Sequence, residues 1–280
     1  MTSLVAAVVG QLARDLVLTI DRAPAAGTAA DAGDRFEQLG GKGANQAVAL
    51  AQLGVRPRLV AVAGDDVIGD VLLDQARRDG IDVAAVIRRR DTLTGLIVEL
   101  LDDDAQWRYV QHLPPGVLLS EADVLAARDV IASADAVLVQ LQQPAPAALA
   151  AARIGREAGR LVVLDGEIVD RRLLAYADVV RADEREAKGL GEHVLDQGPS
   201  LLAVAEADAN LFLWRGGRLR IPLTGDKVVD TTGGGDAFTA ALTAALLRKL
   251  PYEQAAHLAT AAAGATVSHI SGRPNLHRPG

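Results

Sequence analysis

The sequence predicts a three-layer α/β/α fold, in which a doubly wound and mostly parallel sheet carries a small β-sheet lid. Two observations lead to this fold class. Short apolar runs of strand length alternate with Ala- and Leu-rich stretches of helical period along most of the 280 residues. Two other regions instead alternate apolar with polar residues, as strands with one solvated face do.

The apolar runs and the helical stretches are assigned in chain order. Strands are expected at residues 4–9, 58–63, 136–141, 160–164, 178–180, 201–205 and 210–214. Helices are expected at residues 44–53, 69–79, 121–131, 146–158, 171–175, 185–190, 237–249 and 252–268. Strands that are apolar throughout and are separated by helices indicate a parallel sheet that helices cover on both faces.

The two alternating regions, residues 14–39 and 92–113, are expected to supply the lid strands. In the second region one face would carry Thr94, Leu96, Val98 and Leu100, and the other Gly95, Ile97 and Glu99. A turn at residues 102–104 would pair this strand with an antiparallel one. No repeat or low-complexity linker interrupts the chain, so residues 1–280 are expected to form a single domain with this lid.

Composition narrows the functional classes. The chain has no cysteine, which excludes disulfides and thiolate metal sites. Its net charge of −7 argues against a nucleic-acid partner. The apolar start of the chain has the length of a strand and not of a membrane span, so the cytoplasm is the expected location and no membrane partner is expected.

Two glycine clusters remain after the common phosphate-binding motifs are excluded. The P-loop pattern fails because Gly43 follows Gly41-Lys42, and the dinucleotide fingerprint fails after Gly10. The first cluster is Leu39-Gly-Gly-Lys-Gly-Ala-Asn-Gln46, which precedes a helix. Its glycines let a ligand approach the main chain closely, and its lysine and asparagine are donors suited to hydroxyl oxygens. An ordinary strand-to-helix turn is the alternative interpretation.

The second cluster, Asp230-Thr-Thr-Gly-Gly-Gly-Asp236, opens an apolar helix. The first N–H groups of a helix have no partner within the helix and lie at the positive end of its dipole, so the three glycines can form an anion pocket. Beside that pocket, the carboxylate of Asp236 is placed to accept a proton from a hydroxyl group. The alternative is that Asp236 simply caps the helix.

Together, these two clusters resemble the N-terminal and C-terminal signatures of the ribokinase-like (PfkB) carbohydrate kinase family. Their order, their separation and the α/β pattern between them are also similar, so the resemblance spans nearly the whole chain. Further family landmarks are matched by Gly64-Asp65-Asp66 with Gly69, and by Thr94-Gly95.

The resemblance implies a role for each matched position. Asp236 would be the catalytic base, with Gly233, Gly234 and Gly235 as the anion hole and Gly235 also at the nucleotide. Sugar hydroxyls would be held by Asp15, Gly41, Lys42, Asn45 and Gln142. Asp183 and Glu186 would bind the nucleotide, with Glu186 holding Mg²⁺ through water. Asp230 and Thr232 would bind a monovalent cation such as K⁺, with Ser271-Gly272 on its other side. The lids of two chains would pair in a homodimer.

The chain also departs from the family pattern. Ala13-Arg14-Asp15 stands where an Asn-x-Asp segment is usual, Gln142 stands in place of a glutamate, and Asp183 replaces an asparagine. Losing two polar contacts argues against ribose specifically. The nucleotide loop Thr-x-Gly-x-x-Gly should fall near residues 204–210, but both glycines are missing there and Glu206 adds a carboxylate. Weaker ATP binding, another donor and a rearranged loop are the open interpretations.

Three hypotheses follow. The first is an ATP-dependent sugar kinase that transfers the γ-phosphate to a hydroxyl group, expected to be primary, of a small carbohydrate. The second is a protein of the same fold that binds a sugar or nucleotide with little or no turnover. The third is a kinase for nucleosides or ketodeoxy sugar acids. A nucleotide-cofactor oxidoreductase is disfavoured because the dinucleotide fingerprint is missing.

Overall fold

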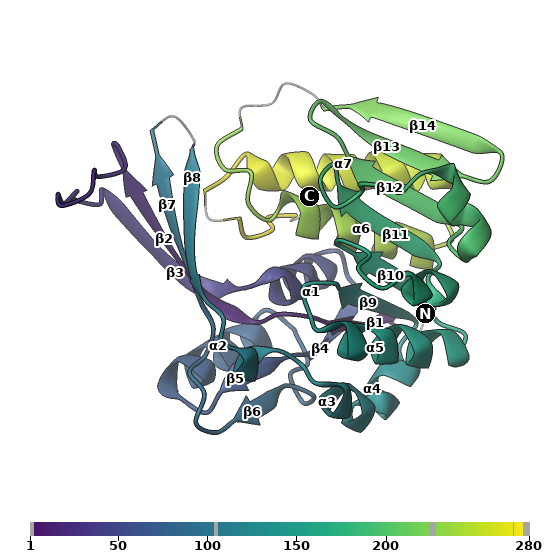
Figure 1. Cartoon of the computed structure of the whole chain (residues 1–280), viewed down its shortest axis with the longest axis horizontal. Coiled ribbons are helices and arrows are strands. Elements are labelled where there is room, and N and C mark those ends of the chain that lie inside the picture. Colours follow the sequence, from purple (N-terminus) through teal and green to yellow (C-terminus); the bar gives the residue numbers. More distant parts are fainter. Residues whose placement is uncertain (1–2, 104–105, 224–227, 271, 277–280) are drawn as a thin grey trace.

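A computed structural model describes residues 3–103, 106–223, 228–270 and 272–276. An eight-stranded sheet runs through it in the order β14-β13-β12-β11-β10-β9-β1-β4 (Figure 1). Its strands are β1 (Val5–Val9), β4 (Arg56–Val60), β9 (Ala136–Gln140), β10 (Leu161–Asp165), β11 (Val179–Asp183), β12 (Leu201–Ala205), β13 (Ala209–Trp214) and β14 (Gly217–Pro222). The neighbouring pairs from β4 to β12 are all parallel, and β13 and β14 add an antiparallel edge.

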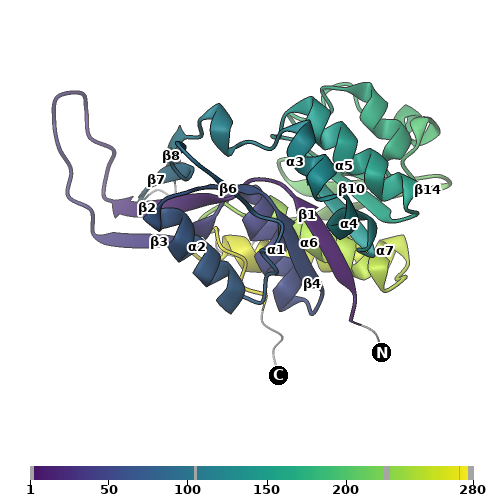
Figure 2. The same cartoon turned by 90° about the horizontal axis from the view of Figure 1, so that it is seen from below.

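Helices cover both faces of this sheet, so the predicted three-layer architecture is confirmed (Figure 2). One face packs on α1 (Lys42–Gln52), α2 (Val67–Arg78), α6 (Gly234–Leu247) and α7 (Tyr252–Val267). The other packs on α3 (Glu121–Ala126), α4 (Arg128–Ala132), α5 (Ala145–Glu157), and the 3₁₀ turns η2 (Arg171–Tyr176) and η3 (Glu192–Gln197). Alternate residues of each strand enter the two cores: Val8 and Leu138 lie in the first, Val9 and Val139 in the second.

A second sheet projects from the main body (Figure 1). This sheet, called the lid here, has the order β3-β2-β7-β8 and consists of β2 (Ala13–Ile20), β3 (Asp34–Gly40), β7 (Leu96–Asp102) and β8 (Trp107–His112). Its two hairpins, β2–β3 and β7–β8, are antiparallel as expected, but β2 and β7 join them in parallel. The turn expected at residues 102–104 lies between β7 and β8, and its last residue, Asp104, is outside the described residues.

Several segments differ from the expected elements. Residues 58–63 do not form one strand, because β4 ends in the main sheet and β5 (Val62–Gly64) pairs instead with β6 (Ile87–Arg89). Residues 171–175 form part of the 3₁₀ turn η2. Strand β14 was not expected, because its arginines interrupt the apolar pattern. The short 3₁₀ turn η1 (Pro115–Val117) was not expected either.

The helix expected at residues 185–190 is wrong, because this segment consists of turns. The Asp183 carboxylate accepts hydrogen bonds from the backbone N–H groups of Arg185 and Glu186, and the Glu186 carboxylate accepts one from Asp183 N–H. These bonds resemble a capping box at a helix start. The helix does not continue because Gly189, at φ 77°, turns the chain away.

The signature residues meet where the carboxyl ends of the parallel strands face the lid. In open α/β sheets this edge is where ligands bind. Across the part of the chain that the structure describes, no helix is long and apolar enough to cross a membrane.

Candidate active site

Asp236 lies in the first turn of α6 and is only 5 % exposed. Helix α6 begins here because Gly233 takes the left-handed conformation at φ 71° as its N-cap, and the first intrahelical bond runs from Ala237 N–H to the Gly233 carbonyl. The N–H groups of Gly234, Gly235 and Asp236 therefore have no acceptor within the helix. Burial raises the pKa of Asp236 to about 7, a value suited to a general base at neutral pH.

Each glycine before Asp236 is required by its surroundings. A Cβ on Gly233 would coincide with the Gly272 carbonyl oxygen, and one on Gly234 would lie 2.7 Å from Val267 Cγ1. At Gly235 a Cβ would lie 2.6 Å from Arg181 Nη2. The three glycines thus allow close packing around the start of α6, whose free N–H groups are suited to an anion.

Two amides of α1 hold the Asp236 carboxylate. Asn45 Nδ2 donates to Asp236 Oδ2 at 3.4 Å, and Gln46 Nε2 donates to Asp236 Oδ1 at 3.2 Å. Both residues are buried, and the carbonyl oxygen of the Asn45 side chain has no partner among the described residues. The structure therefore joins the two signatures: the first orients the carboxylate of the second.

Asp15, on β2, is the second buried carboxylate of the site. Burial is the main cause that raises its pKa to about 7, and the nearby Asp236 carboxylate adds to this. Its Oδ1 has no partner in the described structure. The carboxyl group lies directly against the Cα of Gly40, where any Cβ would coincide with it. The glycine before Gly41 is thus needed to make room for Asp15.

A cavity of about 310 Å³, called the lid cavity here, opens between these residues and the lid. Its walls include all the residues predicted to bind a sugar: Asp15, Gly41, Lys42, Asn45 and Gln142. Asp183, Thr232, Gly233, Gly235 and Asp236 also line it. This volume is at the low end of the range for small-molecule sites.

The lid contacts the second signature directly. The indole N–H of Trp107 donates to Thr231 Oγ1 at 2.7 Å, and Tyr109 Oη lies 2.6 Å from Thr232 Oγ1. The two rings stack at 4.4 Å between centroids. These contacts close the cavity on the side opposite α1.

Glu99, on β7, was not expected in the site. It is 3 % exposed, and its Oε1 accepts a hydrogen bond from Thr232 Oγ1 at 3.2 Å. Burial chiefly, with the nearby Asp230 carboxylate, raises the pKa of Glu99 to about 8. Its place on the inward face of an alternating strand is a signal that the sequence did contain.

Lys42 and the Asp183 turn lie at the cavity's other end. Lys42 Nζ is 3.9 Å from Glu186 Oε1, and the side chain of Glu186 is 17 % exposed. Asp183 lines the cavity while its Oδ1 caps the turn. The described residues contain no cluster of three or more His, Cys, Asp or Glu side chains that would hold a metal ion by themselves.

A second cavity of about 300 Å³, called the apolar cavity here, lies on the other side of Gly235. Its walls include the apolar side chains of Leu223, Val228, Phe238, Ala263 and Val267. It shares three lining residues with the lid cavity: Arg181, Thr231 and Gly235. The anion pocket is therefore located between a polar cavity and an apolar one.

The segment that lacks the two expected glycines is a short turn between β12 and β13. Glu206 N–H donates to the Ala209 carbonyl to close it. The Glu206 carboxylate lines the apolar cavity, but Arg220 Nε on β14 donates to it at 2.9 Å. Arg220 also binds Asp208. An arginine from the unexpected strand thus neutralises the carboxylate that the sequence had placed near a phosphate.

Asp230 is fully buried, and its Oδ1 accepts the Thr232 N–H at 2.8 Å. The Gly272 carbonyl packs against Gly233. Ser271 lies outside the described residues.

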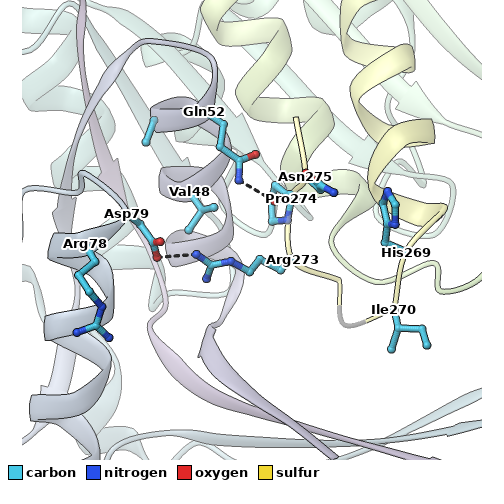
Figure 3. Close-up of a pocket in the computed structure, with 10 residues that line it drawn as sticks. Val48, Gln52, Arg78, Asp79, His269, Ile270, Arg273, Pro274 and Asn275 are labelled. Atoms are coloured by element: carbon cyan, nitrogen blue, oxygen red, sulfur yellow. Dashed lines mark hydrogen bonds and ion pairs between the residues drawn. The ribbon is translucent and has the colours of Figure 1, made fainter. Parts of the chain in front are cut away.

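A third cavity, between α1, α2 and the C-terminal segment, is lined by the side chains that fix this segment (Figure 3). Gln52 Nε2 donates to the Pro274 carbonyl, and Arg273 pairs with Asp79 at 2.6 Å (Figure 3).

The geometry defines a class of protein, a phosphotransferase. A base of raised pKa faces a cavity lined with polar groups, and a pocket of helix N–H groups beside it is suited to an anion that reaches it from a second cavity.

Comparison with known proteins agrees with this class. The pfkB family of carbohydrate kinases matches residues 4–278. A ribokinase of Haemophilus influenzae is 30% identical over 248 residues, which cover 82% of this chain and 81% of that protein. A ribokinase structure from Thermotoga maritima has a TM-score of 0.81 at 25% identity and covers 97% of this chain and 95% of its own. A ribokinase of Arabidopsis thaliana complexed with ribose and ATP shares the fold, with a TM-score of 0.81 at 24% identity, over 98% of this chain and 96% of its own.

The chain belongs to the pfkB family of carbohydrate kinases. The predicted family, fold and enzyme class, a ribokinase-type sugar kinase, are therefore confirmed. Four residues at the site were not predicted from the sequence: Gln46 as a binding residue, Glu99, and the ion-paired Asp165 and Arg181. Asp165 and Arg181 lie just beyond the strands expected at residues 160–164 and 178–180, whereas the structure includes them in β10 and β11.

Proposed function

We propose that this chain transfers the γ-phosphate of ATP to a hydroxyl group of a small neutral sugar bound in the lid cavity. The observation that carries the proposal is the position of Asp236, which faces the lid cavity from the wall that this cavity shares with the apolar one. A base placed there reaches an acceptor on one side while the adjoining N–H groups of α6 reach the phosphoryl group.

In the proposed reaction, a lone pair of the acceptor hydroxyl oxygen forms a bond to the γ-phosphorus. The bond from that phosphorus to the oxygen that bridges it to the β-phosphate breaks, and its electron pair stays on ADP. The hydroxyl proton moves to a carboxylate oxygen of Asp236. The N–H groups at Gly234 and Gly235 stabilise the charge on the phosphoryl oxygens as it passes.

ATP would enter through the apolar cavity. Its base fits the apolar walls between Leu223, Val228 and Val267, and its phosphates would extend past Gly235 toward the lid cavity. The pairing of Glu206 with Arg220 removes one argument against a nucleotide here, because that carboxylate no longer stands unpaired. ATP-binding calorimetry without acceptor tests this assignment.

Two ions would assist. Glu186 is suited to hold Mg²⁺ through water, because Mg²⁺ keeps several waters and takes few carboxylates, and the ion would shield the phosphate charges. The buried Asp230 would supply a negative charge for a monovalent cation such as K⁺, and Thr232, whose N–H binds the Asp230 carboxylate, would supply a neutral oxygen. Replacing K⁺ with tetramethylammonium, which is too large for the site, is expected to lower kcat.

The charges of the lid cavity favour a neutral sugar over a sugar acid. Four carboxyl groups line it, on Asp15, Glu99, Asp183 and Asp236, together with two basic side chains, Lys42 and Arg181. The pKa values of Asp15, Glu99 and Asp236 are raised to about 7 or 8, so the cavity disfavours negative charge, and the carboxylate of a sugar acid would be disfavoured in the same way. A neutral pentose or a fructose-type sugar fits this balance, and a nucleoside remains the next candidate.

A phosphorylation panel with ATP, Mg²⁺ and K⁺ tests the proposal. Ribose, fructose, a ketodeoxy sugar acid and inosine are each offered to the purified chain, and ADP release is measured. We expect turnover with at least one neutral sugar and the lowest kcat/KM with the sugar acid. Micromolar ATP binding without turnover on any acceptor would favour a protein that binds but does not catalyse.

The outer face of the lid supports a homodimer. Residues that alternate with the cavity-lining ones are apolar and at least partly exposed: Leu16, Leu18, Leu96, Val98, Leu100 and Val110. Two such faces would cover each other. Light scattering should report a dimer for the wild type and a monomer for Val98→Asp, whereas Val67→Asp, at a site 74% exposed on α2, should stay dimeric. A monomeric wild type would overturn the dimer.

Since the proposed reaction uses ATP, the cytoplasm remains the proposed location.

A further inference from the structure

Arg181 is a buried arginine at the junction of the two cavities. It lies on β11, in the run Val179-Val180-Arg181-Ala182, and only 8 % of the residue is exposed. Together with Thr231 and Gly235 it lines both the lid cavity and the apolar cavity. An arginine is rarely buried to this degree without a partner or a function.

The guanidinium group lies against the anion pocket. Its Nη2 would be 2.6 Å from a Cβ on Gly235, so only a glycine at that position allows the approach. The guanidinium carbon is also 5.9 Å from the centre of the Phe238 ring. The group thus packs against two residues at the start of α6, Gly235 and Phe238.

Among the described residues this side chain has one hydrogen-bond partner, which orients it and leaves its other N–H donors without an acceptor. Arg181 Nη1 donates to Asp165 Oδ1 at 3.1 Å, in a pair whose side chains are 9% and 2% exposed. Arg181 Nε is buried, with no partner among the residues that the structure describes. A guanidinium group has five N–H donors in a rigid fork. A buried donor without an acceptor destabilises the fold, so a bound acceptor is the expected complement.

The same network fixes Arg181 relative to the base. Asp165 Oδ2 accepts a hydrogen bond at 2.7 Å from Gln46 Nε2, which also donates to Asp236 Oδ1 at 3.2 Å. Arg181, Asp165, Gln46 and Asp236 therefore form one continuous chain of contacts. Burial lowers the pKa of Arg181, but the Asp165 carboxylate, with smaller contributions from Glu186 and Asp236, outweighs burial and raises the pKa, so the guanidinium remains charged.

We propose that Arg181 is a catalytic residue that binds the γ-phosphoryl group while it is transferred from ATP to the acceptor. Its free N–H donors would bind oxygens of the transferred group, adding a full positive charge to the helix N–H groups. The bonds that form and break are those of the reaction above, and the proton still goes to Asp236. Guanidinium groups suit this task because they bind phosphate oxygens through paired, charge-assisted hydrogen bonds. This inference rests on the proposed kinase activity.

A purely structural ion pair is the competing explanation. If Arg181 only neutralised Asp165, removing either partner would have the same effect on turnover. The proposal instead predicts that Arg181→Gln lowers kcat about 10²- to 10³-fold, as for the loss of one oxyanion donor, while acceptor KM changes less than about threefold. Asp165→Asn keeps the arginine. The kcat of this variant should therefore be at least tenfold higher than the kcat of Arg181→Gln.

Arg89→Gln is a matched control. Arg89 likewise pairs with one aspartate, Asp123 at 2.7 Å, and its Nε is likewise buried without a partner among the described residues, but it lines neither cavity. It should leave kcat unchanged. If Arg181→Gln does not fold by circular dichroism, Arg181→Lys replaces it, with an expected loss of at least tenfold because lysine lacks the fork. Millimolar guanidinium should partly restore turnover to Arg181→Ala.

Binding separates this inference from the kinase assignment. By calorimetry, Arg181→Gln should weaken a non-hydrolysable ATP analogue at least tenfold more than it weakens ADP, because only the analogue carries the γ-phosphate. An inactive wild type would overturn the proposed function, and this comparison would still report on the arginine. An active wild type whose Arg181→Gln variant keeps more than one tenth of kcat, or equal weakening of the two nucleotides, would overturn the role of Arg181.

Discussion

The lid cavity and the apolar cavity share the wall at Gly235, yet they are built differently. The lid cavity contains three carboxyl groups whose pKa values are raised to about 7 or 8, on Asp15, Glu99 and Asp236. Among the described residues that line the apolar cavity, Glu206 is the one with a carboxylate, and this carboxylate pairs with Arg220. Buried polar groups left without partners discriminate strongly between ligands, whereas apolar walls do so weakly. Selectivity for the acceptor should therefore reside on the lid side, and the walls that belong to the apolar cavity alone should affect mainly the affinity for the nucleotide.

The largest expected effect comes from Asp236→Asn. The amide keeps the shape of the carboxylate but does not accept the hydroxyl proton, so kcat should fall by about 10³-fold or more. Steady-state kinetics measure the loss, and calorimetry should show that ATP binding changes little. A loss below tenfold would exclude Asp236 as the base and would break the contrast between the two cavities.

A pH profile gives the next largest effect. Asp236 must be ionised to act as a base, and its pKa is raised to about 7, so kcat/KM should fall roughly tenfold per pH unit below that value. Asp15 titrates near the same pH, so the acidic limb belongs to the pair. ATP binding between pH 6 and 8 should vary much less. A profile flat down to pH 5 would contradict the raised pKa.

Gly40→Ala should affect only the lid side. The new Cβ would occupy the place of the Asp15 carboxyl group, which must then move from the cavity. Losing a hydrogen bond to a charged group should raise the acceptor KM roughly 10- to 100-fold. Gly33→Ala is the matched control, because a Cβ there meets only Thr19 Oγ1 at 3.6 Å. An equal rise in the KM for ATP would show that the two cavities are not independent.

The smallest effect is expected on the donor side. Arg220→Gln leaves Glu206 unpaired beside the apolar cavity, and the KM for ATP should rise about two- to fivefold, less at high salt because the pair is solvent-exposed. Arg218→Gln, on the same strand, serves as the control and should leave the KM for ATP unchanged. If Arg220→Gln raised the KM for ATP by a larger factor than Gly40→Ala raises the KM for the acceptor, the comparison between the two cavities would be reversed.

The regular parts of this fold could be predicted because their signals are local. An apolar run such as Val5–Val9 is buried on both faces wherever it pairs, and the alternation within Leu96–Asp102 separates the two faces of a lid strand. The segment at residues 185–190 could not be predicted in this way. Its composition suits a helix, but the side chains of Asp183 and Glu186 bind the backbone and Gly189 turns the chain.

The sequence by itself determined the two glycine signatures, and with them the proposed base and the proposed anion pocket, because glycine conformation and helix N-termini act over a few residues. Only the tertiary structure decided the neighbours of these residues. It brought Gln46 to Asp236 across 190 positions, placed Arg181 against Gly235, and paired Glu206 with an arginine on a strand that had not been expected. Contacts between distant segments depend on strand order and sheet register, which no local pattern encodes.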